Sequence, residues 1–316
     1  YLGPAFSDAE IREALDGLGA VYTAMDEKEM VAATAQALSE GLAVGWFQGR
    51  MEFGPRALGG RSILGDPRSE TMQRTLNLKV KFRESFRPFA PSVLREDLSE
   101  WFELDVDSPY MLLVAPVAAA KRREMTPAER ELFGIEQLNV KRSEIPAVTH
   151  VDHSARIQTV HRATNPLYHA LLSEFKRLTG CPVLVNTSFN VRGEPIVGTP
   201  ADAFRCFMGT DLDLLVVGRQ MLWKERQDPA LGAGLQREIR AGLTGGAVTK
   251  PLHRRSCYEA AASAELLRSR CIGGAIIDLL YHRLRDSLSA SHRRFQYYFI
   301  HTKAHFGTPL RLFSAR

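Results

Sequence analysis

The sequence has no run of about 18–20 apolar residues, the length that a membrane-spanning helix requires. Only 4 of its 316 residues are cysteine, and no two of them form a CxxC pair. This spacing argues against zinc and disulfides, and we expect buried, reduced thiols in a cytoplasmic protein. HExxH, GxxxxGK(S/T) and GxSxG are also missing, which excludes the usual motifs of zinc peptidases, P-loop nucleotidases and α/β-hydrolases.

A secretory leader is also lacking, and the first residue is tyrosine rather than methionine, so we expect a fragment or a processed chain. Acidic residues are scarce only in the last part of the sequence. Residues 226–316 hold 15 Lys and Arg against 6 Asp and Glu, which leaves 26 against 30 in residues 1–225. The net charge is therefore +9 in the last part and −4 in the main part. The main part is not a general polyanion binder, and we do not expect nucleic acid as a partner.

Strand-like and helix-like segments alternate in residues 1–225. Ser7 and Glu10 form a capping box before the first helix, and Asp66 with Pro67 is expected to start another. The alternation predicts an α/β or α+β fold with an open, twisted mixed sheet and flanking helices. Gly/Pro-rich sequence follows Lys224, so residues 226–316 are interpreted as a linker and a basic, partly helical tail. The expected strands are 42–49, 110–117, 154–160, 182–190 and 212–218, and the expected helices include 7–17, 27–41, 167–180 and 201–209.

Four segments combine fixed charge or polar groups with the ends of strands. The first, residues 49–70, places Arg56, Arg61 and Arg68 among glycines and prolines and contains no lysine. Planar guanidinium groups on an irregular backbone suit phosphate or carboxylate binding. A surface loop with scattered charge is the alternative.

The second segment, residues 76–93, contains Lys81, Arg83 and Arg87 between phenylalanines. On an extended strand, Lys81 and Arg83 would point to the same face. Partly buried cations need an anionic partner, which is either a ligand or a carboxylate such as Glu84 or Asp97.

The third and fourth segments are polar at strand positions. In residues 150–160, Asp152, Ser154, Arg156 and Gln158 alternate, which fits either one polar face or an exposed edge strand. His150, His153 and His161 lie close in sequence, but this gives only a weak metal signal, and no metal is assigned. In residues 185–195, Asn186, Ser188 and Asn190 follow an apolar strand, as in phosphate-binding clefts or in capped turns. Together the four segments predict a concave site lined by fixed cations and hydroxyls.

The same four segments resemble the carbamoyltransferases of antibiotic and nodulation-factor biosynthesis, the NodU/CmcH-like family. The resemblance runs from about Tyr1 to Lys224. Gly60 and His153 stand where that family has Asn and Gly. The matching stretches are GRMEFGPRALGGRSILGDPR, KFRESFRPFAPSV, HVDHSARIQTV and VLVNTSFNVRGEPIV.

The resemblance implies a YrdC-like α/β domain that forms carbamoyl-adenylate from ATP, with Mg²⁺, and carbamoyl phosphate. It also implies that an N-terminal Kae1-like domain, which passes the carbamoyl group to an acceptor hydroxyl and carries iron, is missing here. Lys81, Arg156 and Ser188 are implied as catalytic. The implied ATP and carbamoyl phosphate contacts are Arg56, Arg61, Lys81, Arg83, Arg87, Arg156, Asn186, Ser188 and Asn190.

Two other functions stay open at this point. A YrdC-type synthase that makes threonylcarbamoyl-adenylate for tRNA modification would use the same fold, with threonine and bicarbonate in place of carbamoyl phosphate. A non-catalytic nucleotide- or RNA-binding remnant would use the basic tail as its binding arm.

Overall fold

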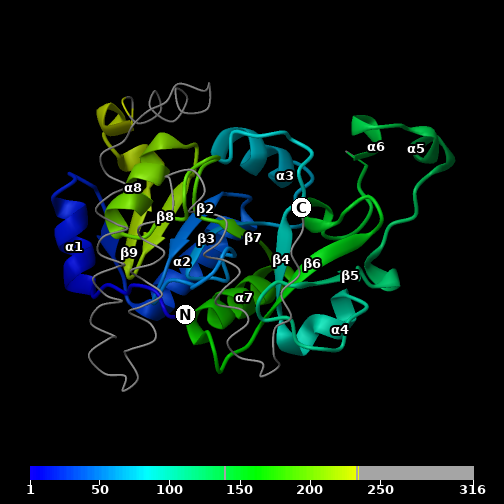
Figure 1. Ribbon diagram of the computed structural model, residues 1–316, viewed down its shortest axis with the longest axis horizontal. Helices are drawn as coiled ribbons and strands as arrows, with labels where there is room; N and C mark the ends of the chain where they lie inside the picture. The colour runs from blue at the N-terminus through cyan, green and yellow to red at the C-terminus, as the bar shows by residue number, and fades with distance from the viewer. Residues whose placement is uncertain (139, 233, 235–316) are drawn as a thin grey trace, which may run out of the picture. The chain divides into compact units, whose positions relative to one another are not determined.

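The computed structural model describes residues 1–138, 140–232 and 234 (Figure 1). The predicted tail, residues 226–316, lies outside the described residues from position 235 onward, and its boundary stays a prediction. The described part contains one nine-stranded mixed sheet. In sheet order its strands are β1 (Thr23–Ala24), β9 (Gln220–Trp223), β8 (Leu214–Val217), β2 (Val44–Phe47), β3 (Arg61–Gly65), β7 (Val183–Ser188), β4 (Ala90–Leu94), β6 (Ser154–Val160) and β5 (Leu113–Pro116).

Most neighbouring strands in the sheet are antiparallel, and the pairs β2/β8 and β4/β6 are parallel. The predicted α/β class with a mixed sheet is therefore confirmed. In β2, β3 and β8 every residue is buried. Strands of this kind need cover on both faces, which explains the nearly continuous apolar sequences of β2 and β8.

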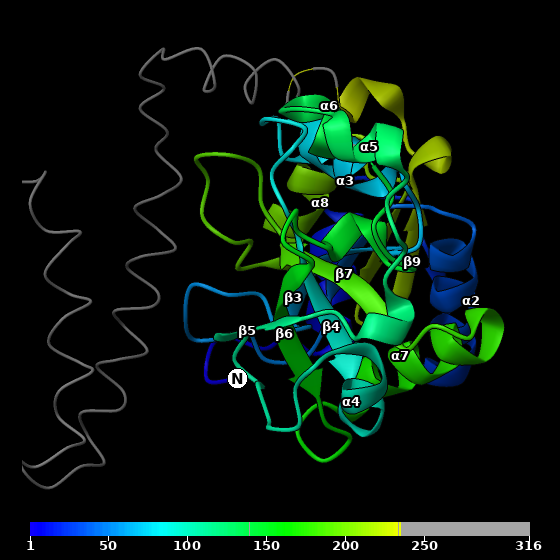
Figure 2. The ribbon, with the colours of Figure 1, turned by 90° about the vertical axis from the view of Figure 1, so that its right-hand side faces the viewer.

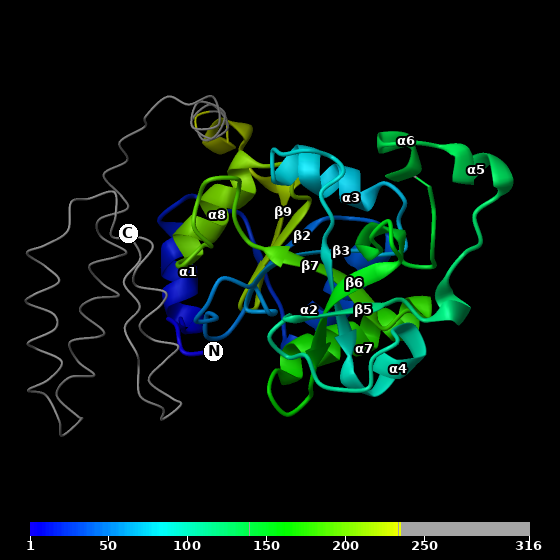
Figure 3. The same ribbon diagram turned by 45° about the vertical axis from the view of Figure 1, so that its right-hand side comes forward.

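Helices supply that cover. Figure 2 shows α2 and α7 together on one side of the sheet and α8 on the other, while Figure 3 shows α5 and α6 on an extension beyond β5 and β6. Among the described residues, no helix is both long and apolar enough to cross a bilayer. The helices are α1 (Asp8–Asp16), α2 (Glu27–Ser39), α3 (Met72–Thr75), α4 (Leu98–Trp101), α5 (Pro127–Glu131), α6 (Ile135–Leu138), α7 (Pro166–Thr179) and α8 (Pro200–Gly209).

Local sequence accounts for several helix ends. The backbone N–H of Glu10 donates to Ser7 Oγ (3.3 Å), and that of Ser7 donates to Glu10 Oε2 (2.7 Å), so the predicted capping box is confirmed. Helix α7 ends at Gly180, whose φ of +75° is the left-handed conformation that glycine adopts most readily. The prediction at Asp66 was wrong. Its carboxylate binds the backbone N–H and the guanidinium of Arg68, and α3 begins only at Met72.

Candidate functional site

A cavity of about 380 Å³ brings all four polar segments together. It lies where the loop after β2, the segment before β4, the strand β6 and the end of β7 meet. The loops that follow β2 and β7 extend from the sheet on the side opposite α2 and α7 (Figure 2). Six of the nine predicted contact residues line this cavity, which we call the cationic pocket: Arg56, Arg83, Arg87, Arg156, Asn186 and Ser188.

The four arginines make the cationic pocket strongly positive. Burial lowers the pKa of Arg83 to about 10, and the nearby charge of Arg87 adds to this effect. Burial also lowers the pKa of Arg156, with a further contribution from Arg56. Within the described ranges none of the four arginines forms an ion pair with a carboxylate. Cations held close together without a protein counter-ion favour an anionic ligand.

The structural ion pairs considered as an alternative for this segment do not form. Asp97 pairs with Lys176 (2.7 Å), and Glu84 pairs with Arg192 (3.8 Å). Arg83 instead donates from Nε to Asn77 Oδ1 (2.6 Å), and its guanidinium carbon lies 5.0 Å from the centre of the Phe89 ring. These contacts fix the direction of a guanidinium group without neutralising its charge.

Lys81 and Arg83 do not share a face of a strand, which corrects the sequence prediction. Residues Leu76–Val80 form a π-helical turn, Lys81 caps it, and β4 begins only at Ala90. Lys81 therefore turns inward, is 3% exposed and does not line the cationic pocket. Its Nζ donates to the backbone oxygen of Ser188, and to the backbone and side-chain oxygens of Asn190 (both 2.8 Å). Lys81 thus fixes the end of β7, where Ser188 lines the pocket.

Asn186 connects the strands beneath the pocket to the loop that carries Arg56. Its Nδ2 donates to Ala57 O (3.1 Å), Ser92 Oγ (3.0 Å) and Gln158 Oε1 (2.7 Å). Its Oδ1 is buried and has no donor within the described residues. A buried acceptor without a partner in a pocket wall is costly unless a ligand supplies the donor.

Strand β6 lies between β4 and β5, so the edge-strand interpretation of residues 150–160 was wrong. Arg156 from this strand reaches the pocket, and its Nε has no partner among the described groups. Gln158 is 3% exposed, and its Nε2 donates to Leu58 O (2.8 Å). Arg156 and Gln158 lie on the same face of β6, but Arg156 lines the pocket wall and Gln158 supports the neighbouring loop.

Two predicted contacts, Arg61 and Asn190, also lie outside the pocket wall. Arg61 is fully buried, and its guanidinium donates to backbone carbonyls, including those of Gln48 and Gly60 (both 2.9 Å). Asn190 accepts from Lys81 and from Ser188 Oγ (2.6 Å). Both residues support the walls from behind.

The other wall residues were not predicted as contacts, and they are Pro55, Ala57, Pro88, Phe89, Ala90, Met111, Val114, His150 and Thr187. His150 accepts from or donates to Ser154 Oγ through Nδ1 (3.2 Å), and burial lowers its pKa. The sequence signal that could have identified His150 is its position just before the alternating polar residues of β6. Met111 has a φ of +56°, which no local sequence pattern indicated.

The two departures from the family pattern have different surroundings. His153 has a φ of +63°, the left-handed region in which glycine is favoured, so the glycine expected here from the family resemblance would adopt this backbone without strain. A Cβ atom on Gly60 would lie 3.0 Å from Arg50 O and 3.1 Å from the carboxylate of Glu52. A larger residue at position 60 would require small shifts of both the Arg50 carbonyl and the Glu52 carboxylate.

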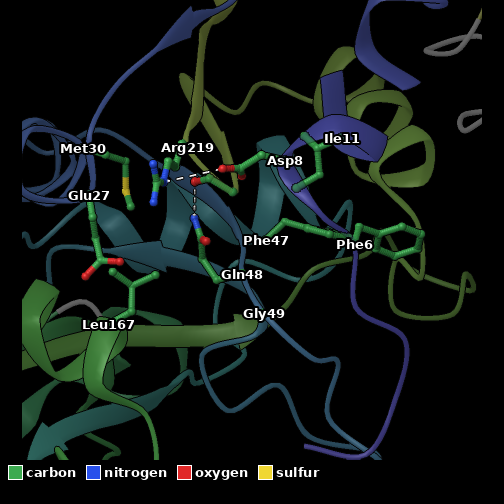
Figure 4. Close-up of a pocket in the computed structure, with 11 residues that line it drawn as sticks. Phe6, Asp8, Ile11, Glu27, Met30, Phe47, Gln48, Gly49, Leu167 and Arg219 are labelled. Atoms are coloured by element: carbon green, nitrogen blue, oxygen red, sulfur yellow. Dashed lines mark hydrogen bonds and ion pairs between the residues drawn. The ribbon is translucent and has the colours of Figure 1, made fainter. Parts of the chain in front are cut away.

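A second cavity of about 250 Å³ lies at the carboxyl ends of β2 and β8 (Figure 4). Its arginine, Arg219, is paired with Asp8 (Nε to Oδ2, 3.5 Å), and Glu27 adds a further carboxylate to the wall. Gln48 donates to Gly218 O (2.8 Å). The charge of this cavity is unsuited to a polyanion, so the cationic pocket is the candidate site.

The chain matches a known protein family and several known proteins. The family model described as "Carbamoyltransferase C-terminus" matches residues 35–224. The chain is 60% identical over 229 residues to an uncharacterized protein of Synechocystis sp., a match that covers 72% of this chain and 37% of that protein. It is 43% identical over 222 residues to nodulation protein NolO of Bradyrhizobium diazoefficiens, covering 69% of this chain and 37% of that protein.

A named enzyme is among the relatives. The chain is 40% identical over 187 residues to 3'-hydroxymethylcephem-O-carbamoyltransferase of Streptomyces clavuligerus, covering 59% of this chain and 32% of the enzyme. The chain thus spans about a third of the length of the curated relatives it matches. A solved structure of full-length HypF, bound to phosphate and nucleotide, aligns with 61% of this chain and 25% of its own, at a TM-score of 0.39 and 16% identity, too distant for a comparison of sites.

Proposed function

Because the chain belongs to the carbamoyltransferase C-terminus family, we propose that it is the carbamoyl-adenylate-forming part of an O-carbamoyltransferase, with ATP and carbamoyl phosphate as substrates. The observation that carries the proposal is the cationic pocket. Arg56, Arg83, Arg87 and Arg156 converge there, and none is neutralised by a carboxylate of the described residues. A triphosphate and an acyl phosphate are both strongly anionic, and fixed guanidinium groups suit them.

The proposed reaction balances with water as the third reactant. Water cleaves carbamoyl phosphate to carbamate and phosphate. A carbamate oxygen then attacks the α-phosphorus of ATP, a new P–O bond forms, the bond between the α-phosphorus and the α–β bridging oxygen breaks, and pyrophosphate leaves. Negative charge grows on the phosphate oxygens and on the departing pyrophosphate. Guanidinium groups already fixed in place stabilise this charge without reorganising in the transition state.

The residues divide into two groups by their geometry. Arg56, Arg87 and Arg156 are the phosphate contacts, and Ser188 Oγ is the hydroxyl that contacts a carbamoyl or phosphate oxygen. Asn186 Oδ1, which is buried without a donor, is the proposed acceptor for the carbamoyl –NH₂. Lys81, Arg61 and Asn190 hold the pocket walls, so their proposed role is positioning rather than contact with the reacting atoms.

Mg²⁺ is proposed to accompany the nucleotide. Within the described ranges no three His, Cys, Asp or Glu side chains are placed to hold a metal ion together. The ion would therefore take its oxygen ligands from the triphosphate and water, as Mg²⁺ commonly does in nucleotide sites.

Transfer to an acceptor hydroxyl is assigned to the part of the relatives that this chain does not span. The supporting observation is that the matched relatives are about three times as long as the matched region. The chain on its own is expected to form the adenylate and not to carbamoylate an alcohol.

Calorimetry with ATP and Mg²⁺ tests the assignment of the pocket. We expect one binding site, with affinity reduced by about 1–3 kcal/mol in Arg56→Ala and in Arg156→Ala, as for loss of a charge-assisted contact. Arg162→Ala is the matched control, because Arg162 is exposed and follows the same strand as Arg156. Equal affinity in the wild type and both pocket variants would remove this cavity as the nucleotide site.

A further inference from the structure

Residues 1–4 lie against the loop that carries Arg56. We call residues 48–60 the arginine loop. The backbone N–H of Gly3 donates to Met51 O (3.0 Å), and that of Met51 donates to Pro4 O (2.9 Å). The approach is close enough to require glycine, because a Cβ atom on Gly3 would lie 2.8 Å from Met51 Cβ and 3.0 Å from Met51 O.

A second contact reaches the part of the loop next to the cationic pocket. The hydroxyl of Tyr1 donates to Leu58 O (2.7 Å) and accepts from Asn165 Nδ2 (3.0 Å). Leu58 O also accepts from Gln158, which lies on β6 two residues after Arg156. One carbonyl, two residues from Arg56, is therefore held both by the N-terminal segment and by a strand of the site.

Arg61 joins the N-terminal segment to the base of the arginine loop. One guanidinium nitrogen donates to Gln48 O and Gly60 O (both 2.9 Å), and the other to Gly49 O and Pro4 O (both 3.2 Å). The guanidinium lies 3.5 Å from the centre of the Phe47 ring. Four carbonyls in two chain segments are bound by one planar fork, a geometry that lysine cannot reproduce.

The loop is also closed on itself by Glu52. Oε1 of this carboxylate accepts from the backbone N–H groups of Leu58 (2.7 Å) and Gly60 (2.6 Å). These two bonds shape the loop internally, whereas the bonds to residues 1–4 fix it from outside. An experiment can therefore distinguish the effect of the bonds from Glu52 from the effect of the bonds to residues 1–4.

We propose that residues 1–4 act as a strap that holds the arginine loop so that Arg56 faces the cationic pocket, with Arg61 as the positioning residue between strap and loop. The inference rests on the proposed function, because it takes Arg56 as a ligand contact. Its physical basis is that a glycine-containing loop keeps considerable backbone freedom unless external contacts restrict it.

Hydrogen exchange of the full chain tests the strap independently of ligand binding. Gly3→Ala is the test variant, and Leu2→Ala is the matched control because the Leu2 side chain is 81% exposed. In Gly3→Ala, exchange at the Met51 amide should be faster by about tenfold or more, whereas the Leu58 and Gly60 amides should change less. An unchanged exchange rate of the Met51 amide in Gly3→Ala would overturn the proposal that residues 1–4 hold the loop.

ATP titration of the same variants tests whether the strap positions Arg56. The dissociation constant should rise about tenfold in Gly3→Ala and stay near the wild-type value in Leu2→Ala. Faster exchange with unchanged affinity would mean that the strap does not position Arg56, which would overturn the proposal. Absence of ATP binding by the wild-type chain would instead contradict the proposed function, while the exchange result still decides whether the strap holds the loop.

Arg61 is tested by the same two measurements. Arg61→Lys keeps the charge but loses the fork, so we expect it to weaken ATP binding nearly as much as Arg61→Gln does. Rescue of both exchange and affinity by Arg61→Lys would show that charge alone is needed and would contradict the positioning role.

Discussion

The Nζ atom of Lys81 lies 2.8 Å from the backbone oxygen of Asn190 and 2.8 Å from its side-chain oxygen. This pair fixes the turn after β7 from inside the protein. Lys81 has no carboxylate partner among the described residues, and burial lowers its pKa to about 7. Two measurable consequences follow from its position, one for stability and one for the site.

The first prediction concerns stability and pH. The pKa of Lys81 is about 7 in the folded protein and 10.5 as its ordinary value, so between these pH values the unfolded chain binds more protons. The Lys81 contribution to the free energy of unfolding should therefore increase as the pH rises from about 7 toward 10.5. Urea unfolding should show that the difference in free energy of unfolding between the wild type and Lys81→Met shifts in favour of the wild type from pH 7 to pH 9. A difference that is independent of pH would contradict the lowered pKa.

The second prediction concerns the catalytic contacts. Arg156→Ala and Ser188→Ala should each reduce the rate of ATP–pyrophosphate exchange by about 10²–10³, as for loss of one donor that stabilises developing charge. Lys81→Met should also reduce it, because the bonds from Nζ to Ser188 and Asn190 that fix the end of β7 are lost. Arg162→Ala serves as the control. Near-normal exchange in Arg156→Ala would exclude its role in the transition state.

The third prediction uses His150, which lines the pocket beside Arg156. Burial lowers its pKa, Asp152 raises it, and Arg156 and Arg142 lower it further, so it is mainly neutral at pH 7. Protonation adds positive charge to the wall. ATP affinity of wild type relative to His150→Gln should therefore increase as the pH is lowered from about 7.5 to 5.5. The ratio cancels the titration of ATP itself, and a constant ratio would show that His150 does not face the phosphates.

The fourth prediction separates the main part from the rest of the chain. Gln227 donates to Val21 O (2.7 Å) and accepts from its backbone N–H (3.0 Å), so contacts of the main part continue beyond residue 225. Truncation after residue 234 should leave ATP affinity and Tm nearly unchanged, whereas truncation after residue 225 should lower Tm. Loss of ATP affinity on removing residues 235–316 would show that the tail contributes to the site.

Sequence reasoning was most successful where the signal is local or periodic. The capping box at Ser7, the glycine end at Gly180 and the buried strand at 183–188 all depend on neighbouring residues, and all are confirmed. The convergence of Arg56, Arg87 and Arg156 was predicted from polar groups at strand ends. The sheet order brings those ends together.

The failures occurred where tertiary contacts override local pattern. The spacing of Lys81 and Arg83 fits a strand, but the chain forms a π-helical turn that buries one side chain and leaves the other at the pocket. Arg61 has the same sequence context as Arg56, yet the carbonyls around it include one from Pro4, 57 residues earlier. Contacts over such distances in sequence leave no periodic signal.

ATP–pyrophosphate exchange tests the central claim most directly. Labelled pyrophosphate should enter ATP when carbamoyl phosphate is supplied with Mg²⁺, because adenylate formation is reversible and requires the carbamoyl donor. Omission of carbamoyl phosphate should abolish exchange, and acetyl phosphate is the control for a general acyl phosphate effect. Exchange that requires threonine and bicarbonate instead would assign the chain to threonylcarbamoyl-adenylate synthesis. Tight ATP binding without exchange under any of these conditions would contradict a catalytic role.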